Sequence, residues 1–355
     1  MMNQSERTRK QLALHALAYP RIQIEDVFKF LYQSAFGCEH MVTSLPRATE
    51  YIKQEAAGRL DGDGHLIDPL DGDYSRVHLG YVNEGLKAET LAALFCLSAK
   101  AEPCGAALLE QKLDVAHELA SQGALPFSPE EFSEARAAWR AQGYPPLHHS
   151  NTFREIYRPA YRVIANEYLP FLPLLQEIDR LTSKGTAVVA VEGGSASGKT
   201  TLGKLLSHVY DCTVLHMDDF FLRPEQRTPE RLAEPGGNVD RERFLSEVLI
   251  PLSRRETVSY RAFDCATRAL TPPISIAPKR LTVIEGAYAM HPALESYYNF
   301  SVFLDVSPEL QRERILKRNS PHMAERFFNE WIPLERLYFS DLRVRERCDL
   351  TIEIR

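Results

Sequence analysis

The sequence lacks several features that would each place it in a specialised class of protein. Its six cysteines are scattered and none forms a Cys-x-x-Cys pair, which argues against a zinc knuckle or a disulfide framework. No apolar run reaches membrane-spanning length, and the first residues, MMNQSERTRKQ, have no signal-peptide core. There is no internal repeat and no low-complexity tract. From these absences we expect a cytoplasmic protein in a reducing environment.

An excess of charge of one sign is also missing. The net charge is −6, with 42 Lys and Arg residues interleaved with 48 Asp and Glu residues. We therefore expect neither a nucleic-acid partner nor a membrane partner. The chain has 355 residues, of which 44% are apolar, and this is enough for two domains with their own cores. The sequence does not determine the oligomeric state, and a homo-oligomer is one of the possibilities.

The most informative stretch is residues 187–202, AVVAVEGGSASGKTTL. Five apolar residues predict a buried strand, and Gly193, Gly198, Lys199 and Thr200 then follow the G-x-x-x-x-G-K-[ST] spacing of a phosphate-binding P-loop. Glycines let backbone amides curl around an anion, and the helix that follows directs its positive end toward that anion. A ligand-free Gly/Ser turn between strand and helix is the alternative. The predicted nucleotide-binding residues are Gly193, Gly194, Ser195, Ala196, Ser197, Gly198, Lys199, Thr200 and Thr201.

Two side chains of this loop have distinct chemical roles. Lys199 is a mobile positive charge suited to the β- and γ-phosphates, and the Thr200 hydroxyl suits Mg²⁺. The sequence therefore predicts ATP and Mg²⁺ as cofactors, with Lys199 acting in catalysis and Thr200 as a metal ligand.

The pattern of the chain changes near residue 183. Residues 1–182 read as amphipathic helices, with helix starts at 128–131 and 152–155, a long helix over 161–181 and an extended segment at 76–82. Later, short apolar runs alternate with helical segments, which predicts a parallel sheet with helices on both faces. We expect a doubly wound, five-stranded α/β domain over residues 183–355, preceded by a mainly α-helical domain over 1–182. The predicted strands are residues 187–191, 213–217, 281–285, 300–305 and 350–354.

Acidic residues follow two of these strands. Ligands of doubly wound sheets lie beyond the carboxyl ends of the strands, where a carboxylate can accept a proton from an attacking hydroxyl. Asp218 leaves its strand first, so we interpret it as the base, while Asp219 caps the next turn. Glu285 ends another strand and is the predicted second magnesium anchor. The alternative is that these acids only cap loops.

The segment from residue 310 to 347 is rich in arginine and lysine. Cations on a mobile segment over the phosphates would neutralise charge in the transition state and exclude water. Arg314 and Arg318 are the predicted catalytic cations, and a solvated basic helix is the alternative.

Several motifs occur in one order: GGSASGKTTL, MDDFF, GGNVDRERF, YRAFDCATR, VIEG and LQRERILKRN. In this order, over about residues 186–355, the chain resembles the uridine kinase/phosphoribulokinase group of P-loop kinases. It is also similar to ribosylnicotinamide kinases through Asp-Asp-Phe-Phe. The resemblance implies that Asp218 is the catalytic base, that Asp240 holds the ribose hydroxyls of the substrate, and that Glu285 lies near magnesium. It also implies that Arg314 and Lys317 belong to a lid.

The chain departs from this family at one position. Uridine kinases have Tyr-Asp-Phe followed by a base-contacting histidine, whereas this chain has Phe263-Asp264-Cys265 and then Arg268. Arg261 and Arg268 would suit an anionic substrate, such as a sugar phosphate or an acid, at least as well as a nucleoside. The predicted substrate-binding residues are Asp240, Arg261 and Arg268.

These features predict an ATP-dependent phosphotransferase that moves the γ-phosphoryl group of ATP to a hydroxyl of a small nucleoside- or sugar-like metabolite. The alternative is a nucleotide-dependent switch with the N-terminal domain as its effector, but the chain has no Asn-Lys-x-Asp guanine-reading motif. A nucleotide sensor without catalysis is a third interpretation, which the intact Lys199, Thr200 and Asp218 disfavour.

The N-terminal half carries no motif of comparable weight and resembles no family. Cys38-Glu39-His40 and His148-His149 would form a metal cluster only if folded together, and packed or surface histidines are favoured. Basic residues of this half could reach the substrate, so its role is open between a substrate cap and a regulatory module. These basic residues are Lys53, Arg154, Arg158 and Arg162.

Overall fold

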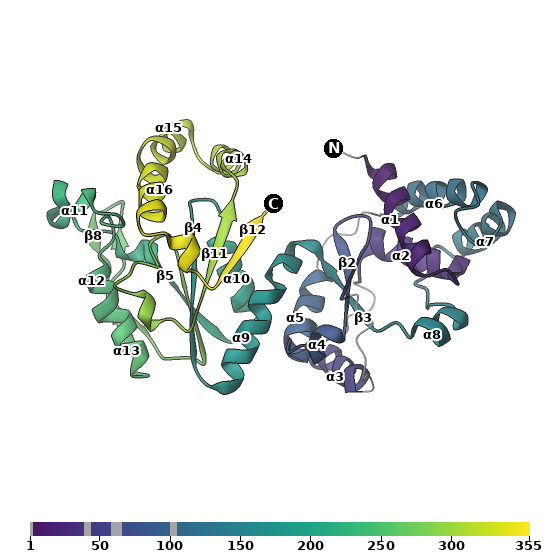
Figure 1. Ribbon diagram of the computed structural model, residues 1–355, viewed down its shortest axis with the longest axis horizontal. Coiled ribbons are helices and arrows are strands. Elements are labelled where there is room, and N and C mark those ends of the chain that lie inside the picture. The colour runs from purple at the N-terminus through teal and green to yellow at the C-terminus, as the bar shows by residue number, and fades with distance from the viewer. Residues whose placement is uncertain (1–2, 39–43, 58–65, 100–104) are drawn as a thin grey trace. The chain divides into compact units, whose positions relative to one another are not determined.

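The computed structural model describes residues 3–38, 44–57, 66–99 and 105–355. The chain divides into two compact units, Met1–Leu169 and Pro170–Arg355 (Figure 1). The boundary predicted from the sequence, between residues 182 and 183, falls within the last turn of helix α9 (Leu172–Lys184). The units divide before α9 because this helix packs against β4 (Ala187–Gly193) of the second unit.

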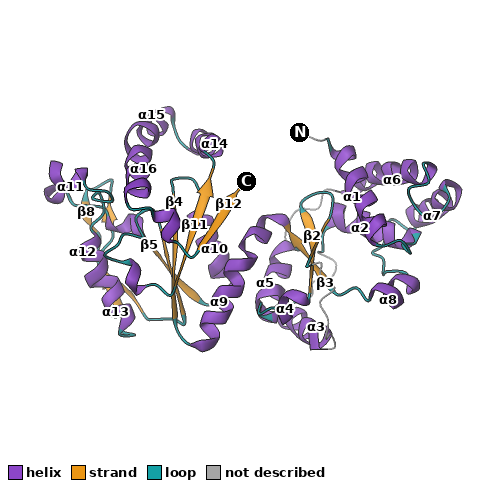
Figure 2. Cartoon of the chain, in the orientation of Figure 1, coloured by secondary structure: helices purple, strands orange, loops and turns teal. Residues whose placement is uncertain are grey.

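The first unit is mainly helical, as predicted, and also contains a small antiparallel sheet (Figure 2). The strands lie in the order β1 (Ile67–Pro69), β2 (Tyr74–His78) and β3 (Tyr161–Ala165). Its helices are α1 (Gln4–Ala18), α2 (Ile24–Phe36), α3 (Leu45–Ala57), α4 (Gly80–Asn83), α5 (Ala88–Ser98), α6 (Gly105–Ser121), α7 (Pro129–Ala141) and α8 (Asn151–Tyr157).

Two local predictions for this unit are wrong. The long helix expected over residues 161–181 begins instead as β3, which pairs with β2 and buries the β-branched Val163 and Ile164. The helix expected to start at 152–155 starts earlier, because the hydroxyl of Ser150 accepts a hydrogen bond from Phe153 N at 3.1 Å. The start at 128–131 is confirmed, with Ser128 and Glu131 forming a reciprocal cap.

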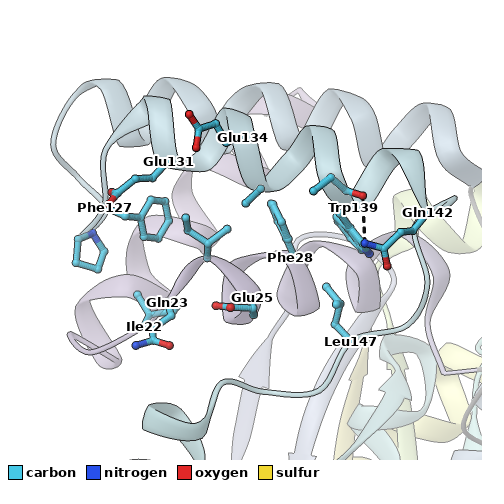
Figure 3. A pocket seen from close by; sticks show the side chains of 14 residues that line it. Ile22, Gln23, Glu25, Phe28, Phe127, Glu131, Glu134, Trp139, Gln142 and Leu147 are labelled. Atoms are coloured by element: carbon cyan, nitrogen blue, oxygen red, sulfur yellow. Dashed lines mark hydrogen bonds between the residues drawn. The ribbon is translucent and has the colours of Figure 1, made fainter.

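A cleft of about 730 Å³ lies between α2 and α7 of the first unit (Figure 3). Phe28 and Trp139 stack in it, with ring centroids 4.6 Å apart, and Glu25 and Glu134 lie on its two walls. The lining is thus aromatic with an acidic rim.

The second unit is built on a five-stranded parallel sheet, as predicted, and the structure places its strands in the order β12–β11–β4–β10–β5 (Figure 1). All five sequence-predicted strands are present, and 281–285 and 350–354 match to the residue. Strands buried on both faces require the nearly continuous Val, Ile and Leu runs seen in the sequence. The bounds not yet given are β5 (Cys212–His216), β10 (Leu281–Glu285), β11 (Phe300–Val306) and β12 (Leu350–Ile354).

Helices cover both faces of this sheet. On one face α10 (Lys199–Val209) packs against β4, β5 and β10, and a Cβ on its Gly203 would lie 3.2 Å from Val214 Cγ1. On the other face the strand residues Ala190 and Ile284 share a buried core with Phe244 and Tyr338. The other helices are α11 (Pro229–Ala233), α12 (Arg241–Phe244), α13 (Ile250–Ser253), α14 (Pro308–Arg318), α15 (Pro321–Arg326), α16 (Ile332–Asp341) and α17 (Val344–Arg347).

Two short hairpin pairs complete the unit: β6 (Val258–Tyr260) with β9 (Ile274–Ile276), and β7 (Phe263–Asp264) with β8 (Ala269–Leu270). Within the described ranges of the chain, no helix combines the length and the apolar character needed to cross a bilayer.

Candidate active site

The predicted strand–loop–helix is present at the carboxyl end of β4. Gly193, Ala196 and Gly198 have φ angles of +145°, +60° and +104°, so the loop turns back on itself before α10 begins at Lys199. A Cβ on Gly193 would lie 2.7 Å from Leu304 O and would collide with it. Only glycine therefore lets the loop pass this close to β11.

Polar groups of the loop are arranged around its bend. The Lys199 ammonium group folds back over the loop and donates to Gly193 O at 2.7 Å and to Gly194 O at 3.0 Å. The Ser197 hydroxyl is buried and has no hydrogen-bond partner in the described part of the chain. A buried hydroxyl without a partner is costly unless a ligand supplies one, and a phosphate oxygen is such a partner. The loop therefore fits the phosphates of a nucleotide.

Thr200 and Glu285, the two predicted metal ligands, are brought together. The Thr200 hydroxyl donates to Glu285 Oε1 at 3.0 Å. Because β10 pairs in parallel with β5, Glu285 also lies beside His216, whose Nδ1 is 2.6 Å from the same oxygen. Burial alone would raise the pKa of Glu285, but hydrogen bonds from His216 and Thr200 outweigh it and lower that pKa. The same hydrogen bond raises the pKa of His216. His216 was not among the residues predicted from the sequence, although its position at the end of β5 was the available signal.

Asp218 and Asp219 follow β5 in one turn and have different environments. Asp219 Oδ2 accepts a hydrogen bond from the Tyr260 hydroxyl at 2.9 Å, so it anchors the turn to β6. Part of the Asp218 side chain is exposed to solvent, but the protein atoms around its carboxyl group displace water and raise its pKa. The positive charge of Lys199 acts in the opposite direction and lowers that pKa. Within the described residues no hydrogen bond to this carboxylate is seen, and the charge of Lys199 reaches it, which suits the predicted role as base; that role stays a prediction.

Helices α14 and α16 reach the P-loop from the far end of the chain. Glu335 accepts from Ser195 N at 2.9 Å and from the Ser195 hydroxyl at 2.6 Å. Gln311 donates to Ser195 O at 2.8 Å, and Arg314 donates to Ala196 O at 3.1 Å. Arg314 thus reaches the loop, as a lid cation would. Glu335 and Gln311 were missed, since no local pattern marks a residue whose partner is more than a hundred positions away.

The other predicted residues bond to structural partners or lie exposed at the surface. The buried Asp240 caps α12 and accepts from Gln226 and Arg243, at 3.0 Å and 3.2 Å. Arg261 donates to two backbone carbonyls of the β7–β8 hairpin region, while Arg268 is exposed in the turn of that hairpin. Arg318 stacks on Phe327, 5.4 Å from the ring centroid. The substrate role of Asp240, Arg261 and Arg268 and the catalytic role of Arg318 stay predictions.

The first unit contains the residues considered for a metal cluster and the basic residues considered for substrate contact. Cys38 is buried and donates its thiol to Phe95 O at 3.7 Å, while Glu39 and His40 lie outside the described residues. In the part of the chain that is described, no group of three or more His, Cys, Asp and Glu residues could hold a metal ion. Lys53 and Arg162 form ion pairs with Glu89 and Glu55, respectively.

Glu192 precedes the loop and is completely buried. It accepts hydrogen bonds from Gly193 N at 2.9 Å, Met290 N at 3.0 Å and the Tyr338 hydroxyl at 3.1 Å. Burial raises the pKa of Glu192 to about 7, against the effect of these hydrogen bonds and of Lys199. This carboxyl group therefore joins the end of β4 to α16 and titrates near neutral pH.

The raised pKa of Glu192 predicts a pH-dependent stability. The unfolded chain releases this proton near pH ~4.3, whereas the folded protein keeps it up to a pKa of about 7. Between these values only the folded state holds the proton, so the free energy of unfolding falls as pH rises, by roughly 4 kcal/mol. Glu192→Gln removes the titrating group. The free energy of unfolding, measured by denaturant titration, should therefore fall between pH ~4.3 and about 7 in the wild type by more than it does in the variant. A difference between the two that is independent of pH would contradict the assignment.

Comparisons with known proteins show similarity over about half of the chain. A possible uridine kinase from Bacillus stearothermophilus is 20% identical, with a TM-score of 0.38, covering 51% of this chain and 99% of its own. The protein TT1252 from Thermus thermophilus is 16% identical (TM-score 0.27; 48% and 90% covered), and shikimate kinase from Aquifex aeolicus is 17% identical (TM-score 0.26; 47% and 86% covered). No protein-family model matches the sequence, and no curated protein matches it. Similarities of this size do not distinguish one substrate from another.

Proposed function

We propose that the second unit is an ATP-dependent kinase that transfers the γ-phosphoryl group of ATP to a hydroxyl of a small metabolite. The proposal rests on several groups that meet at one edge of the sheet. The P-loop there has the buried Ser197 hydroxyl, which lacks a partner among the described residues, and the Lys199 ammonium group. The hydrogen-bonded Thr200 and Glu285 and the Asp218 carboxylate lie at the same edge. A P-loop alone fits any nucleotide-binding protein. The added carboxylate in reach of the loop lysine's charge favours transfer to an acceptor.

Each side chain has a defined task in this proposal. Lys199 and the amides of residues 194–201 hold the phosphates, and Asp218 orients the acceptor hydroxyl and takes its proton. Arg314, which already bonds to the loop at Ala196, stabilises the negative charge that develops during transfer. Helices α14 and α16 limit water at the loop through Gln311 and Glu335.

Magnesium fits this donor set through hard oxygen ligands. The Thr200 hydroxyl and the Glu285 carboxylate lie within one hydrogen bond of each other, and Mg²⁺ prefers one or two such protein ligands together with phosphate and water. When bound, Mg²⁺ neutralises charge on the phosphates. His216 holds the Glu285 carboxylate in place from the neighbouring parallel strand β5.

The acceptor we propose is a small nucleoside- or sugar-like molecule in the cytoplasm, neither a nucleic acid nor a lipid. A screen of nucleosides, sugar phosphates and hydroxy acids for stimulation of ADP release tests this directly. We expect one class to accelerate ADP release by several orders of magnitude over the rate without acceptor, with a phosphorylated product. Slow hydrolysis that no acceptor stimulates would contradict a kinase and would indicate the nucleotide-dependent switch.

A further inference from the structure

The first unit contains a second cleft, of about 420 Å³, whose lining is basic. It lies between α2, α3, the segment before α8, and α8 itself. Its volume is that of a site for a small molecule. It is lined by Lys29, Glu55, His148, His149, Arg154, Arg158, Pro159 and Ala160.

The positive charges of this cleft are not balanced. Glu55, the one carboxylate of the lining, is engaged by Arg162, which donates to both of its oxygens at 3.0 Å and 3.1 Å. Among the described residues, Lys29 donates to the carbonyl of Leu147, at 2.8 Å. Within residues 3–38, 44–57, 66–99 and 105–355, neither Lys29 nor Arg154 nor Arg158 forms an ion pair. Three cations therefore line one cleft without an ion-pair partner in these ranges, and the charge of Asp26 offsets that of Lys29 only in part.

His149 forms a rigid wall of the cleft. Its Nδ1 lies 2.8 Å from Asp26 Oδ1 and its Nε2 lies 2.6 Å from the Tyr161 hydroxyl. Burial lowers the pKa of His149 to about 4, so the ring is neutral at pH 7. Both ring nitrogens are already bonded, which leaves none to bind a metal ion. The wall is thus fixed by a network within the protein, and the ligand contacts belong to the cations.

The buried Arg76 behind this wall adds to the positive potential. Its Nε donates to Gln33 Oε1 at 2.9 Å, and its guanidinium lies 4.7 Å from the Tyr161 ring centroid. Its Nη2 is buried and has no hydrogen-bond partner among the described residues. Burial, followed by the charge of Arg76, lowers the pKa of Lys29 to about 8. An anion in the cleft would reverse this shift.

The backbone at the cleft is also strained. Arg158 ends α8 with φ +44°, a left-handed conformation that favours glycine. Such conformations persist where the surroundings hold them, and they concentrate at ligand sites. Here the conformation leaves an arginine rather than a glycine at the edge of the cleft.

We propose that this cleft binds a small molecule carrying a phosphate monoester, held by Lys29, Arg154 and Arg158. Guanidinium groups bind phosphate through paired hydrogen bonds, and a phosphate monoester carries nearly two negative charges at pH 7. A single carboxylate would match the three cations less well. The inference concerns the first unit and does not rest on the proposed function of the second.

The test uses the full chain in a Lys199→Gln background, which weakens phosphate binding at the P-loop. Calorimetric titration with glycerol 2-phosphate should give a saturable site. The dissociation constant should rise at least about tenfold in the Arg154→Gln/Arg158→Gln double variant and also in Lys29→Gln. Arg47→Gln, which changes an exposed arginine elsewhere in the same unit, is the matched control and should bind like the parent.

Two further titrations test whether the cleft prefers a phosphate to a carboxylate ligand. Inorganic phosphate should compete with glycerol 2-phosphate, and succinate should bind at least about tenfold more weakly, because its charges lie on two separate carboxylates. Circular dichroism should show that all variants are folded. Binding that the double variant leaves unchanged, the absence of a saturable site in the parent, or succinate binding as tightly as the phosphate would each overturn the proposal.

Discussion

Asp218→Asn should bind ATP normally and lose phosphoryl transfer, with turnover lower by about 10²–10⁴-fold, the usual contribution of a general base. Asparagine keeps the shape of the side chain but cannot accept the proton of the acceptor hydroxyl. Desolvation raises the pKa of Asp218, so this carboxylate becomes protonated at a higher pH than an ordinary aspartate. As pH is lowered, the wild-type rate should therefore begin to fall at a higher pH than it would with an ordinary aspartate as the base. The measurement is kcat with the acceptor identified by the screen, alongside ATP affinity from calorimetry.

The neighbouring carboxylate provides the matched control for this variant. Asp219 lies in the same turn but accepts its hydrogen bond from Tyr260, so Asp219→Asn should keep turnover within about tenfold of wild type while losing some stability. If Asp218→Asn retained near-normal turnover, Asp218 would not be the base.

Lys199→Gln should lower turnover by about 10²–10³-fold, the loss expected when a preorganised charge is removed from a developing anion. The Lys199 ammonium already lies over the loop, bonded to the carbonyls of Gly193 and Gly194, so it needs little reorganisation to meet phosphate. Its charge also lowers the pKa of Asp218 and of Glu335 against their burial. In the variant the pKa of Asp218 should therefore rise further. ATP affinity should fall as well, because the ammonium group no longer attracts the phosphates.

Lys204→Gln controls for the loss of a lysine from the same helix. Lys204 is exposed on α10 and makes no ion pair in the described part of the chain, so its replacement should leave both turnover and affinity unchanged. Equal losses in the two variants would mean that the effect comes from net charge and not from the loop geometry.

The parts of the site that the sequence predicts are those set by local pattern. Buried strands need continuous apolar runs, and the P-loop needs glycine at Gly193 because Leu304 O leaves no room for a Cβ. Parallel pairing then brings the strand ends together, which is why Thr200 and Glu285 meet as expected.

The parts that the sequence did not reveal depend on tertiary contacts. Glu335 reaches Ser195 only because α16 folds over the loop, and no spacing rule connects them. The segment 161–165 was predicted as helix, but its Tyr161, Val163 and Ile164 favour a strand, and pairing with β2, which no local pattern shows, makes it one. The units divide before α9 because this helix packs on β4, a contact that no local pattern shows.

The central claim is that the loop after β4 binds the phosphates of ATP while Asp218 faces the terminal phosphoryl group. A crystal structure with Mg²⁺ and a non-hydrolysable ATP analogue tests it most directly. We expect phosphate oxygens within hydrogen-bond distance of the amides of residues 194–201 and of Lys199 Nζ, with the Asp218 carboxylate directed toward the γ-phosphate. A loop without phosphate, or an Asp218 side chain turned away from it, would contradict the account.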